Sequence, residues 1–244
     1  MNKLALMLTI LVGVVTTLTG CKELTPFNQM IDLPIPAEAI NPADFVSTID
    51  NPYFSLIPGT TWIYESVEDD EVERIEVTVT SQTRVVMGVN TVVVRDTVYV
   101  DGEKVEDTFD WYAQDRDGNV WYFGEDSTEF EDGEASCTCG SWEAGVDGAL
   151  PGIIMKAHPK VGDAYRQEYF VEIAEDMARV ESVNESVSVV YGQYKKVLKT
   201  KEWSPLDPGV EENKFYASGV GLVKEQKVKG GDGQVQLIEM RIKP

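Results

Sequence analysis

Acidic and amide side chains are spaced as oxygen ligands in one short stretch of the chain. Asp115, Asp117 and Asn119 stand at positions 1, 3 and 5 of a window that Asp126 closes at position 12. Calcium takes six to eight hard oxygen ligands, which carboxylates and amides at alternate positions of a loop can supply. The spacing would allow a weak calcium site; the expectation from the sequence is no cofactor, with calcium as the alternative.

The same residues also meet the needs of an ordinary hairpin turn. Asp, Gly and Asn are common turn residues, and Gly118 stands at position 4 of the window, whereas the helix–loop–helix calcium motif has its glycine at position 6. A strand is expected after Asn119, where that motif has a helix. We therefore favour a turn at 115–119 and keep the calcium site as the alternative.

No catalytic constellation can be assembled from the sequence. His158 is the single histidine, and no Gly-x-Ser-x-Gly elbow is present, which argues against a serine triad. Gly230-Gly231-Asp232-Gly233 lies between predicted strands, whereas a phosphate loop precedes a helix. Paired-carboxylate hydrolysis stays open, but 42 Asp and Glu residues make it impossible to nominate a pair. We predict no catalytic residue.

The first 20 residues have the features of an export signal. Lys3 provides a positive charge, and residues 4–15 are apolar but too few to span a bilayer. Leu18-Thr19-Gly20-Cys21 follows, and this segment resembles the lipobox of bacterial lipoprotein precursors. The resemblance covers residues 1–22 and implies a mature chain that begins at Cys21, anchored by acyl chains such as palmitate. An ordinary signal peptide with an incidental cysteine is the alternative.

The residue after the acylated cysteine bears on the location. Lipoproteins with Asp at that position tend to stay in the inner membrane of bacteria that have two membranes, and here the residue is Lys22. The resemblance therefore implies the outer membrane, on its periplasmic face or at the cell surface. In a bacterium with one membrane it implies the extracytoplasmic face of the plasma membrane. The lipid bilayer is then the partner of Cys21.

Two further cysteines are one residue apart. If the resemblance holds for Cys21, then Cys137 and Cys139 remain in an oxidising compartment, where a disulfide is favoured. Such a bridge closes a very small loop, so it restricts the unfolded chain little. Free thiols with a redox role, or a soft-metal site with Met155 and His158, are the alternatives.

Charge excludes one large class of partner. The formal net charge is −21, which becomes −22 without the signal segment, and nucleic-acid binding requires a basic surface. A strong net charge also opposes self-association, so we expect a monomer. With 43% hydrophobic residues the composition is that of a globular protein and not of a disordered chain.

A proline-rich segment precedes the globular part. Residues 22–58 contain six of the eleven prolines, which disfavours a long helix. We expect residues 21–57 to be a tether whose aromatic and aliphatic side chains dock on the domain near its end, with a fully disordered linker as the alternative. The docking side chains would be those of Phe45, Ile49, Tyr53 and Phe54.

Alternation of apolar and polar residues predicts strands through most of residues 58–244. Asp101-Gly102 is expected to form a hairpin turn, and residues 164–182, which show both helical and strand spacing, are assigned to strand. The expected strands cover 61–65, 74–80, 91–100, 104–113, 120–123, 194–203, 214–217, 220–227 and 235–242.

Spacing of glycines and aromatics suggests an internal repeat of 58–126 in 161–225. The repeat predicts that Trp62 and Tyr165 point into one core, and that an extra residue before Gly192 forms a bulge or loop. The alternative explanation is that β meanders in general place glycine at turns and aromatic residues on the core face. The residues expected to superpose are Gly59 on Gly162, Gly88 on Gly192, and Ala113 on Ala217.

Adjacent aromatics mark two neighbouring strands. In Trp111-Tyr112 and Trp121-Tyr122-Phe123 successive rings point to opposite faces of a sheet. We favour a structure in which both faces are covered by other parts of the chain. An exposed aromatic face for a glycan, peptide or lipid is the alternative.

These patterns predict an all-β fold: an antiparallel meander of two similar half-sheets, packed as a sandwich or as an open or closed barrel. Tyr216 to Lys224 resembles a segment of uncharacterised secreted β-sheet proteins, which implies a long strand in a curved sheet. The predicted function is a non-catalytic binding or structural module. A carrier for an apolar ligand in a half-barrel and an acid/base hydrolase that uses carboxylates are the alternatives.

Overall fold

The computed structural model describes residues 40–69 and 71–242, and the predicted acylation site Cys21 lies outside these residues. One short 3-10 turn and eighteen strands make up the described part. They are η3 (Pro42–Asp44), β1 (Phe45–Val46), β2 (Asp50–Asn51), β3 (Phe54–Ser55), β4 (Thr60–Glu68), β5 (Glu71–Val86), β6 (Val89–Val100), β7 (Glu103–Asp115), β8 (Val120–Glu131), β9 (Glu134–Cys137), β10 (Trp142–Glu143), β11 (Leu150–Met155), β12 (Ala164–Arg166), β13 (Glu168–Tyr169), β14 (Met177–Val189), β15 (Gly192–Trp203), β16 (Glu211–Ala217), β17 (Gly221–Lys229) and β18 (Gln234–Ile242).

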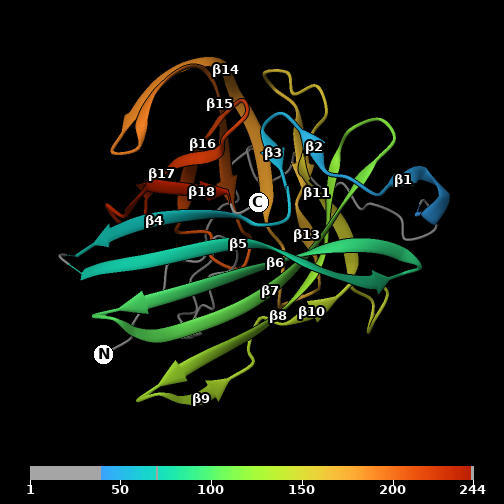
Figure 1. Ribbon diagram of the computed structural model, residues 1–244, viewed down its shortest axis with the longest axis horizontal. Helices are drawn as coiled ribbons and strands as arrows, with labels where there is room; N and C mark the ends of the chain where they lie inside the picture. The colour runs from blue at the N-terminus through green and yellow to red at the C-terminus, as the bar shows by residue number, and fades with distance from the viewer. Residues whose placement is uncertain (1–39, 70, 243–244) are drawn as a thin grey trace, which may run out of the picture.

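Sixteen of the strands form one antiparallel sheet that curves almost into a barrel (Figure 1). The order along the sheet is β12-β14-β15-β16-β17-β18-β4-β5-β6-β7-β8-β11-β13, and β2 and β3 form a separate hairpin. The predicted all-β antiparallel class is confirmed. Of the architectures left open, the nearly closed barrel is the one found.

The two ends of the sheet meet at the segment that joins β12 to β13. Before Gln167 this segment pairs with β14, and after it with β11, so the two ends of the sheet order are consecutive in sequence. The backbone N–H of Gln167 itself donates to the carbonyl of Asp176 at 2.8 Å. The described residues of the region 164–182 thus contain strands and no helix, which confirms the assignment to strand, and a turn that was not predicted.

Hairpin turns form where the sequence has residues that tolerate positive φ. Asp101 and Gly102 have φ of 53° and 83° and join β6 to β7, which confirms the predicted turn. Met87 and Gly88 have φ of 50° and 79° and join β5 to β6 in the same way. These tight connections fix the register of the long central strands.

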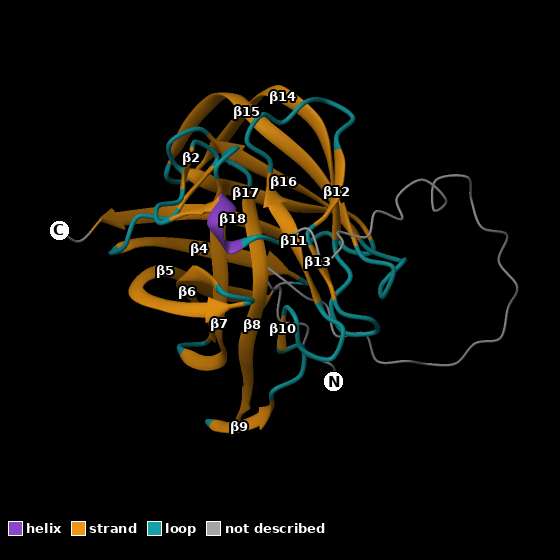
Figure 2. Ribbon diagram, turned by 90° about the vertical axis from the view of Figure 1, so that its right-hand side faces the viewer, coloured by secondary structure: helices purple, strands orange, loops and turns teal. Residues whose placement is uncertain are grey.

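Residues 40–57 cross the barrel as a strap. The ring of Phe45 lies edge-on to Trp121 and Phe123, with centroid distances of 6.1 and 5.5 Å. Ile49 is buried, and the backbone N–H of Asn51 donates to the side-chain oxygen of Gln114 at 2.9 Å. The purple turn η3 in Figure 2 belongs to this strap. The expected docking of the aromatic side chains is therefore found.

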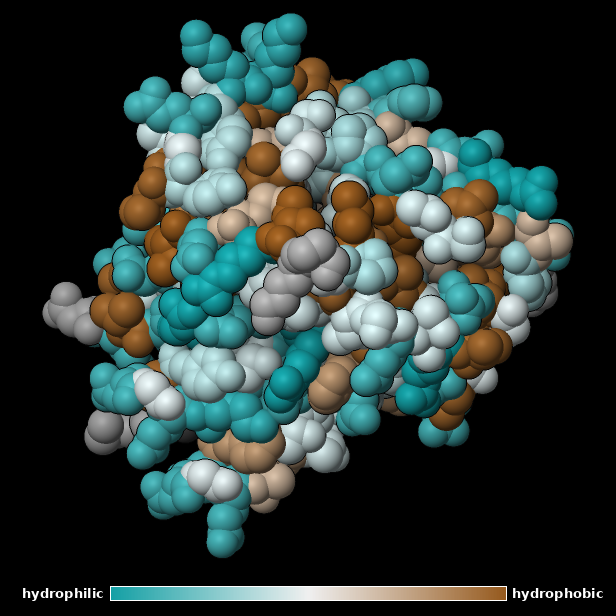
Figure 3. Space-filling view, viewed as in Figure 1, coloured by the Kyte–Doolittle hydropathy of each residue, from teal (hydrophilic) through white to brown (hydrophobic). Residues whose placement is uncertain are grey.

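The strap and the barrel interior cover the paired aromatics of β7 and β8. Trp111, Tyr112, Tyr122 and Phe123 are all buried, and Trp121 is partly buried. The favoured prediction, in which both faces of the sheet are covered at these aromatic residues, is confirmed. On the face shown in Figure 3, hydrophilic side chains cover most of the surface and hydrophobic side chains form small separate groups.

The two predicted repeats begin in the same way. The N–H of Gly59 donates to the carbonyl of Val79, and the N–H of Gly162 donates to that of Val180, both at 2.9 Å. Trp62 and Tyr165, three residues after each glycine, are both buried in the core. The first strand of each repeat therefore enters the barrel with equivalent hydrogen bonding.

The second predicted equivalence is wrong by one residue. Gly88 is part of the β5–β6 turn, whereas Gly192 follows the β14–β15 turn and pairs with Val189. The register between β14 and β15 shifts three times between Val180 and Ser186. Val86 pairs with Val89 across the first turn and Val189 with Gly192 across the second, so Tyr191 corresponds to Gly88. Tyr191 lies as many residues after Gly162 as Gly88 lies after Gly59, so no extra residue precedes the second turn and the expected extra residue is not found.

Among the described residues, no helix has the length and apolar character needed to cross a membrane.

Candidate functional site

A small cavity lies between the strap and the inner face of the barrel. Its volume is about 40 Å³, enough for a few water molecules or one small polar group. Most of the wall is apolar or aromatic, and two carboxyl groups form its polar part. The lining residues are Phe54, Ser55, Leu56, Trp62, Tyr64, Val77, Val94, Asp96, Asp110, Tyr112, Gly221 and Leu222.

Strand register places the two carboxyl groups in the cavity. Asp96 on β6 pairs with Val77 on β5, and Asp110 on β7 pairs with Val94 on β6. Side chains of directly opposed residues share a face of the sheet, and here that face is the barrel interior. Asp96 and Asp110 are accordingly only 6% and 5% exposed.

Two aromatic walls of the cavity are fixed by hydrogen bonds to β17 and to the turn that precedes it. The indole N–H of Trp62 donates to the carbonyl of Val220 at 2.7 Å. The hydroxyl of Tyr64 donates to the carbonyl of Leu222 at 3.1 Å. Both bonds span the junction between the two halves of the barrel, so the rings are held rigidly against the cavity.

Asp110 belongs to a buried hydrogen-bonded group. The hydroxyl of Tyr122 lies 2.7 Å from Oδ1 of Asp110 and 2.6 Å from Oε2 of Glu125. Asp110 and Glu125 face each other on β7 and β8. Two carboxyl groups are thus bridged by one phenol inside the barrel.

A second group lies beside it on the same face. The hydroxyl of Thr108 is 2.8 Å from Oε1 of Glu106 and 2.8 Å from the hydroxyl of Ser127. Thr108 pairs directly with Asp96 across β6 and β7. The inner face of β6, β7 and β8 therefore carries a continuous row of oxygen-bearing side chains.

Burial sets the protonation of these carboxyl groups. It raises the pKa of Asp110 and that of Glu106 to about 7 each, and hydrogen bonds from Tyr122 and Thr108 oppose the rise. Burial also raises the pKa of Asp96 well above its usual range, and the nearby charges of Asp110 and Glu106 raise it further. The site can therefore hold or release protons near neutral pH.

The predicted calcium ligands are placed differently. Asp115 accepts the N–H of Asn119 at 2.9 Å and the indole N–H of Trp121 at 2.8 Å, which are bonds that hold the turn. Asp117 is exposed in that turn, and Asp126 lies along β8 opposite Phe109. No group of three His, Cys, Asp or Glu within 40–69 and 71–242 is arranged to hold a metal ion. The favoured turn is present, and calcium binding stays a prediction.

The cysteine pair lies on the surface at the end of β9. Cys137 and Cys139 form a disulfide in the structure, and the backbone N–H of Cys139 donates to Sγ of Cys137 at 3.0 Å. Met155, which the soft-metal alternative requires, is buried, whereas His158 is exposed. The redox state in solution stays a prediction that thiol titration can test.

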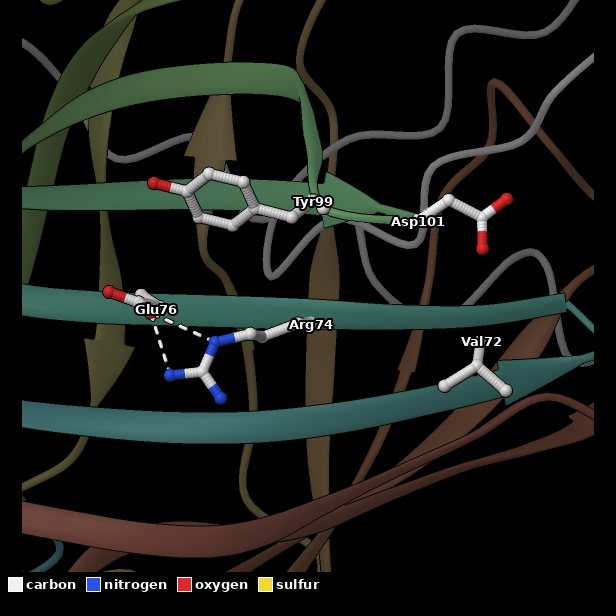
Figure 4. A pocket seen from close by; sticks show the side chains of 6 residues that line it. Val72, Arg74, Glu76, Tyr99 and Asp101 are labelled. Carbon is white, nitrogen blue, oxygen red and sulfur yellow. Dashed lines mark hydrogen bonds and ion pairs between the residues drawn. The ribbon is translucent and has the colours of Figure 1, made fainter.

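A second hollow lies on the outer face of the sheet (Figure 4). It has a volume of about 310 Å³ and is lined by exposed or half-buried side chains of β5 and β6, including Val72 and Tyr99. Arg74 and Glu76 form an ion pair at 2.7 Å within it, so their charges satisfy each other. No buried polar group lines this hollow, which makes it a weaker candidate site than the cavity under the strap.

Sequence reasoning did not select Asp96, Glu106 or Asp110. One signal was available: Asp96 stands in the row Val94, Asp96, Val98, where apolar residues alternate on a predicted central strand. A carboxylate in the apolar row of such a strand must be buried. The partners on β7 and β8 could not be identified without the register.

The chain matches no family model and no curated protein. Two solved structures are similar in shape. One is a protein assigned as exported, with a YmcC-like fold, from Bacteroides fragilis, with a TM-score of 0.48 and 14% identity over 78% of this chain and 98% of that one. The other is a protein assigned as a lipoprotein, from Parabacteroides distasonis, with a TM-score of 0.44 and 13% identity over 78% of this chain and 99% of that one.

Proposed function

We propose that this protein is an extracytoplasmic lipoprotein whose barrel is a non-catalytic binding module. The observation that carries the binding role is the cavity under the strap, where Asp96 and Asp110 converge within aromatic walls. A few convergent polar groups in an apolar cavity are typical of ligand sites. The lipobox-like segment ending at Cys21 supports the anchoring role.

The strap links the two roles. Phe54 and Leu56, which line the cavity, belong to the chain segment that follows the proposed anchor. A ligand in the cavity would contact both the barrel and the strap. The anchor would hold the site near the membrane, which we propose is the outer membrane where the bacterium has one, because Lys22 follows Cys21.

The size of the cavity bears on the carrier alternative. A carrier for an apolar ligand needs an interior wider than the side chains can fill. The cavity of about 40 Å³ admits a small head group but not a whole lipid chain. We therefore rank the carrier below the binding module.

One observation favours an acid/base hydrolase as a second candidate. Asp96 and Asp110 are two buried carboxyl groups in one cavity, and the pKa of about 7 for Asp110 suits proton transfer at neutral pH. If this candidate is correct, Asp110→Asn abolishes hydrolysis of a substrate that the native protein cleaves. Ligand binding without turnover by the native protein would favour the binding module.

Fractionation of expressing cells tests the anchoring. The native chain should be found with membranes, and Cys21→Ser should leave them, because the acyl chains supply the membrane affinity. Lys22→Asp is the matched control, which should stay membrane-bound but move to the inner membrane. A Cys21→Ser chain that remains fully with membranes would refute the lipoprotein proposal. Native mass spectrometry of the released variant tests for a retained ligand.

A further inference from the structure

The second half of the barrel contains a buried ammonium group between two carboxyl groups. Nζ of Lys214 lies 3.0 Å from Oε2 of Glu202 and 3.5 Å from Oε2 of Glu225. All three side chains are less than 10% exposed. A buried charge requires compensation, and the ammonium of Lys214 offsets the charge of one carboxylate. Burial raises the pKa of Glu225 well above its usual range, which favours the neutral form of the second acid.

Strand register relates this cluster to the cavity under the strap. Lys214 pairs with Glu225 on the following strand, just as Asp110 pairs with Glu125. A register shift then follows in both hairpins, after which Tyr216 pairs with Leu222 and Tyr112 with Tyr122. The preceding strands extend the match: Thr200 pairs with Lys214 as Val94 pairs with Asp110.

Two residues further along these same strands, β15 and β6, the acids also correspond. Glu202 lies two residues after Thr200, and Asp96 lies two residues after Val94, each on the inner face. The first half thus keeps the two acids of the Lys214 cluster, as Asp96 and Glu125, but has Asp110 where the second half has its lysine. In the described part of the chain neither Asp96 nor Asp110 forms an ion pair with Lys or Arg.

An unsatisfied atom marks the place where a cation would bind. Oδ1 of Asp96 is buried without a hydrogen-bond partner, although its residue is only 6% exposed. Asp96 lines the cavity together with Trp62 and Tyr64, whose ring faces attract positive charge. A buried carboxylate oxygen without a partner costs free energy that a bound donor would recover.

We propose that the cavity under the strap binds the primary ammonium group of an alkyl amine. This ammonium pairs with the buried acids of the cavity as Lys214 pairs with those of the other half. The ammonium donates to Asp96 and Asp110, and its alkyl chain contacts the apolar part of the cavity wall, which includes Phe54 and Leu222. The volume suits an –NH3+ group and its first methylene but not a trimethylammonium. This inference rests on the proposed binding function and names its ligand class.

A bound ammonium favours the ionised carboxylates, so binding releases protons and tightens as the pH rises through about 7. Titratable and charged groups surround these two acids and their neighbours on every strand around the cavity. They are Tyr64 on β4, Glu73 on β5, Glu106, Asp107 and Tyr112 on β7, Tyr122 and Glu125 on β8, Glu168 on β13 and Glu225 on β17.

Titration of the full-length Cys21→Ser chain with 1,4-diaminobutane at pH 8 tests the proposal. Calorimetry or Trp fluorescence should give saturable binding, and 1-butanol should give none. Asp96→Asn should weaken binding by about tenfold or more, the loss expected for one charge-assisted hydrogen bond. Asp117→Asn, an exposed change in the 115–119 turn, is the matched control and should bind as the native chain does.

The source of the amine is resolved by a second probe, Nα-acetyl-lysine amide. Tighter binding of the lysine derivative would indicate a peptide side chain, and tighter binding of the diamine would indicate a small polyamine. If Asp96→Asn does not fold, the native chain at pH 5 serves instead, where binding should be at least tenfold weaker than at pH 8.

No saturable amine binding, equal binding of 1-butanol, or equal affinity at both pH values would overturn the amine proposal. If native mass spectrometry then finds a different retained ligand, the binding function stands and only the ligand class is wrong. If it finds none and Cys21→Ser stays with membranes, the proposed function itself fails.

Discussion

The hydroxyl of Tyr122 forms a hydrogen bond of 2.7 Å with Oδ1 of Asp110 inside the barrel. The same hydroxyl lies 2.6 Å from Glu125, and a phenol has one proton to donate. It can donate to one carboxylate and must accept from the other, which therefore carries a proton. Geometry alone thus requires at least one protonated carboxyl group at this site, in agreement with the raised pKa of both acids.

Replacement of the phenol tests this arrangement. Tyr122→Phe removes the bridging hydroxyl and leaves the oxygens of Asp110 and Glu125 that faced it without that partner. We expect a loss of about 1–3 kcal/mol in the free energy of unfolding, larger at pH 8 than at pH 5, because ionised carboxylates need the donor most. Urea denaturation at the two pH values measures it, and an equal loss at both would contradict the shared proton.

Stability should fall as the pH rises from about 4.5 to about 7. The pKa of Glu106 is about 7 in the folded state against 4.5 in the unfolded chain, so between these values the folded state binds more protons. This one group contributes about 3 kcal/mol to the fall, and Asp96, Asp110 and Glu125 add to it in the same direction.

Glu106→Gln should flatten this pH dependence, since glutamine keeps an acceptor for Thr108 but does not ionise. The difference in unfolding free energy between pH 5 and pH 8 is the quantity to compare. Asp117→Asn provides an exposed control that should leave it unchanged. An unaltered slope in Glu106→Gln would show that Glu106 is not protonated in the folded protein at pH 5.

Loss of the buried ammonium should be severe. Lys214→Met leaves Glu202 and Glu225 without their cation, at an expected cost of about 3–5 kcal/mol. Lys201→Met removes a partly exposed ion pair with Glu211 on the same strands and should cost less than about 1 kcal/mol. Chemical denaturation of both variants gives the comparison, and similar costs would argue against the role of Lys214.

The cysteine pair gives a direct chemical test. Cys21→Ser protein from the periplasm should react with no alkylating reagent before reduction and with two equivalents after it, as a Cys137–Cys139 disulfide requires. Reactivity of both thiols without reductant would mean that the pair is reduced or metal-bound. Stability should change little on reduction, because so short a loop restricts the unfolded chain weakly.

Alternation and turn residues were sufficient to predict the class of the fold. Apolar residues at every second position indicate strands, and Asp101-Gly102 indicates the turn that joins two of them, because both are local consequences of backbone geometry. The docking of Phe45 and Ile49 followed from their hydrophobicity alone. The equivalence of Gly88 and Gly192 failed because Gly88 lies within its turn, whereas Gly192 follows its turn and Tyr191 takes the corresponding position.

The cavity and its carboxyl groups were decided by the tertiary structure. Asp110 and Glu125 are two of 42 acidic residues, and nothing near them in sequence separates them from acids on the solvent face. Register between strands brings them opposite each other, and curvature of the sheet, whose two ends meet at Gln167, turns that face inward. Burial then raises the pKa of each carboxyl group. The chemistry of the site arises from which face is enclosed, and a one-residue change of register would have exposed it to solvent.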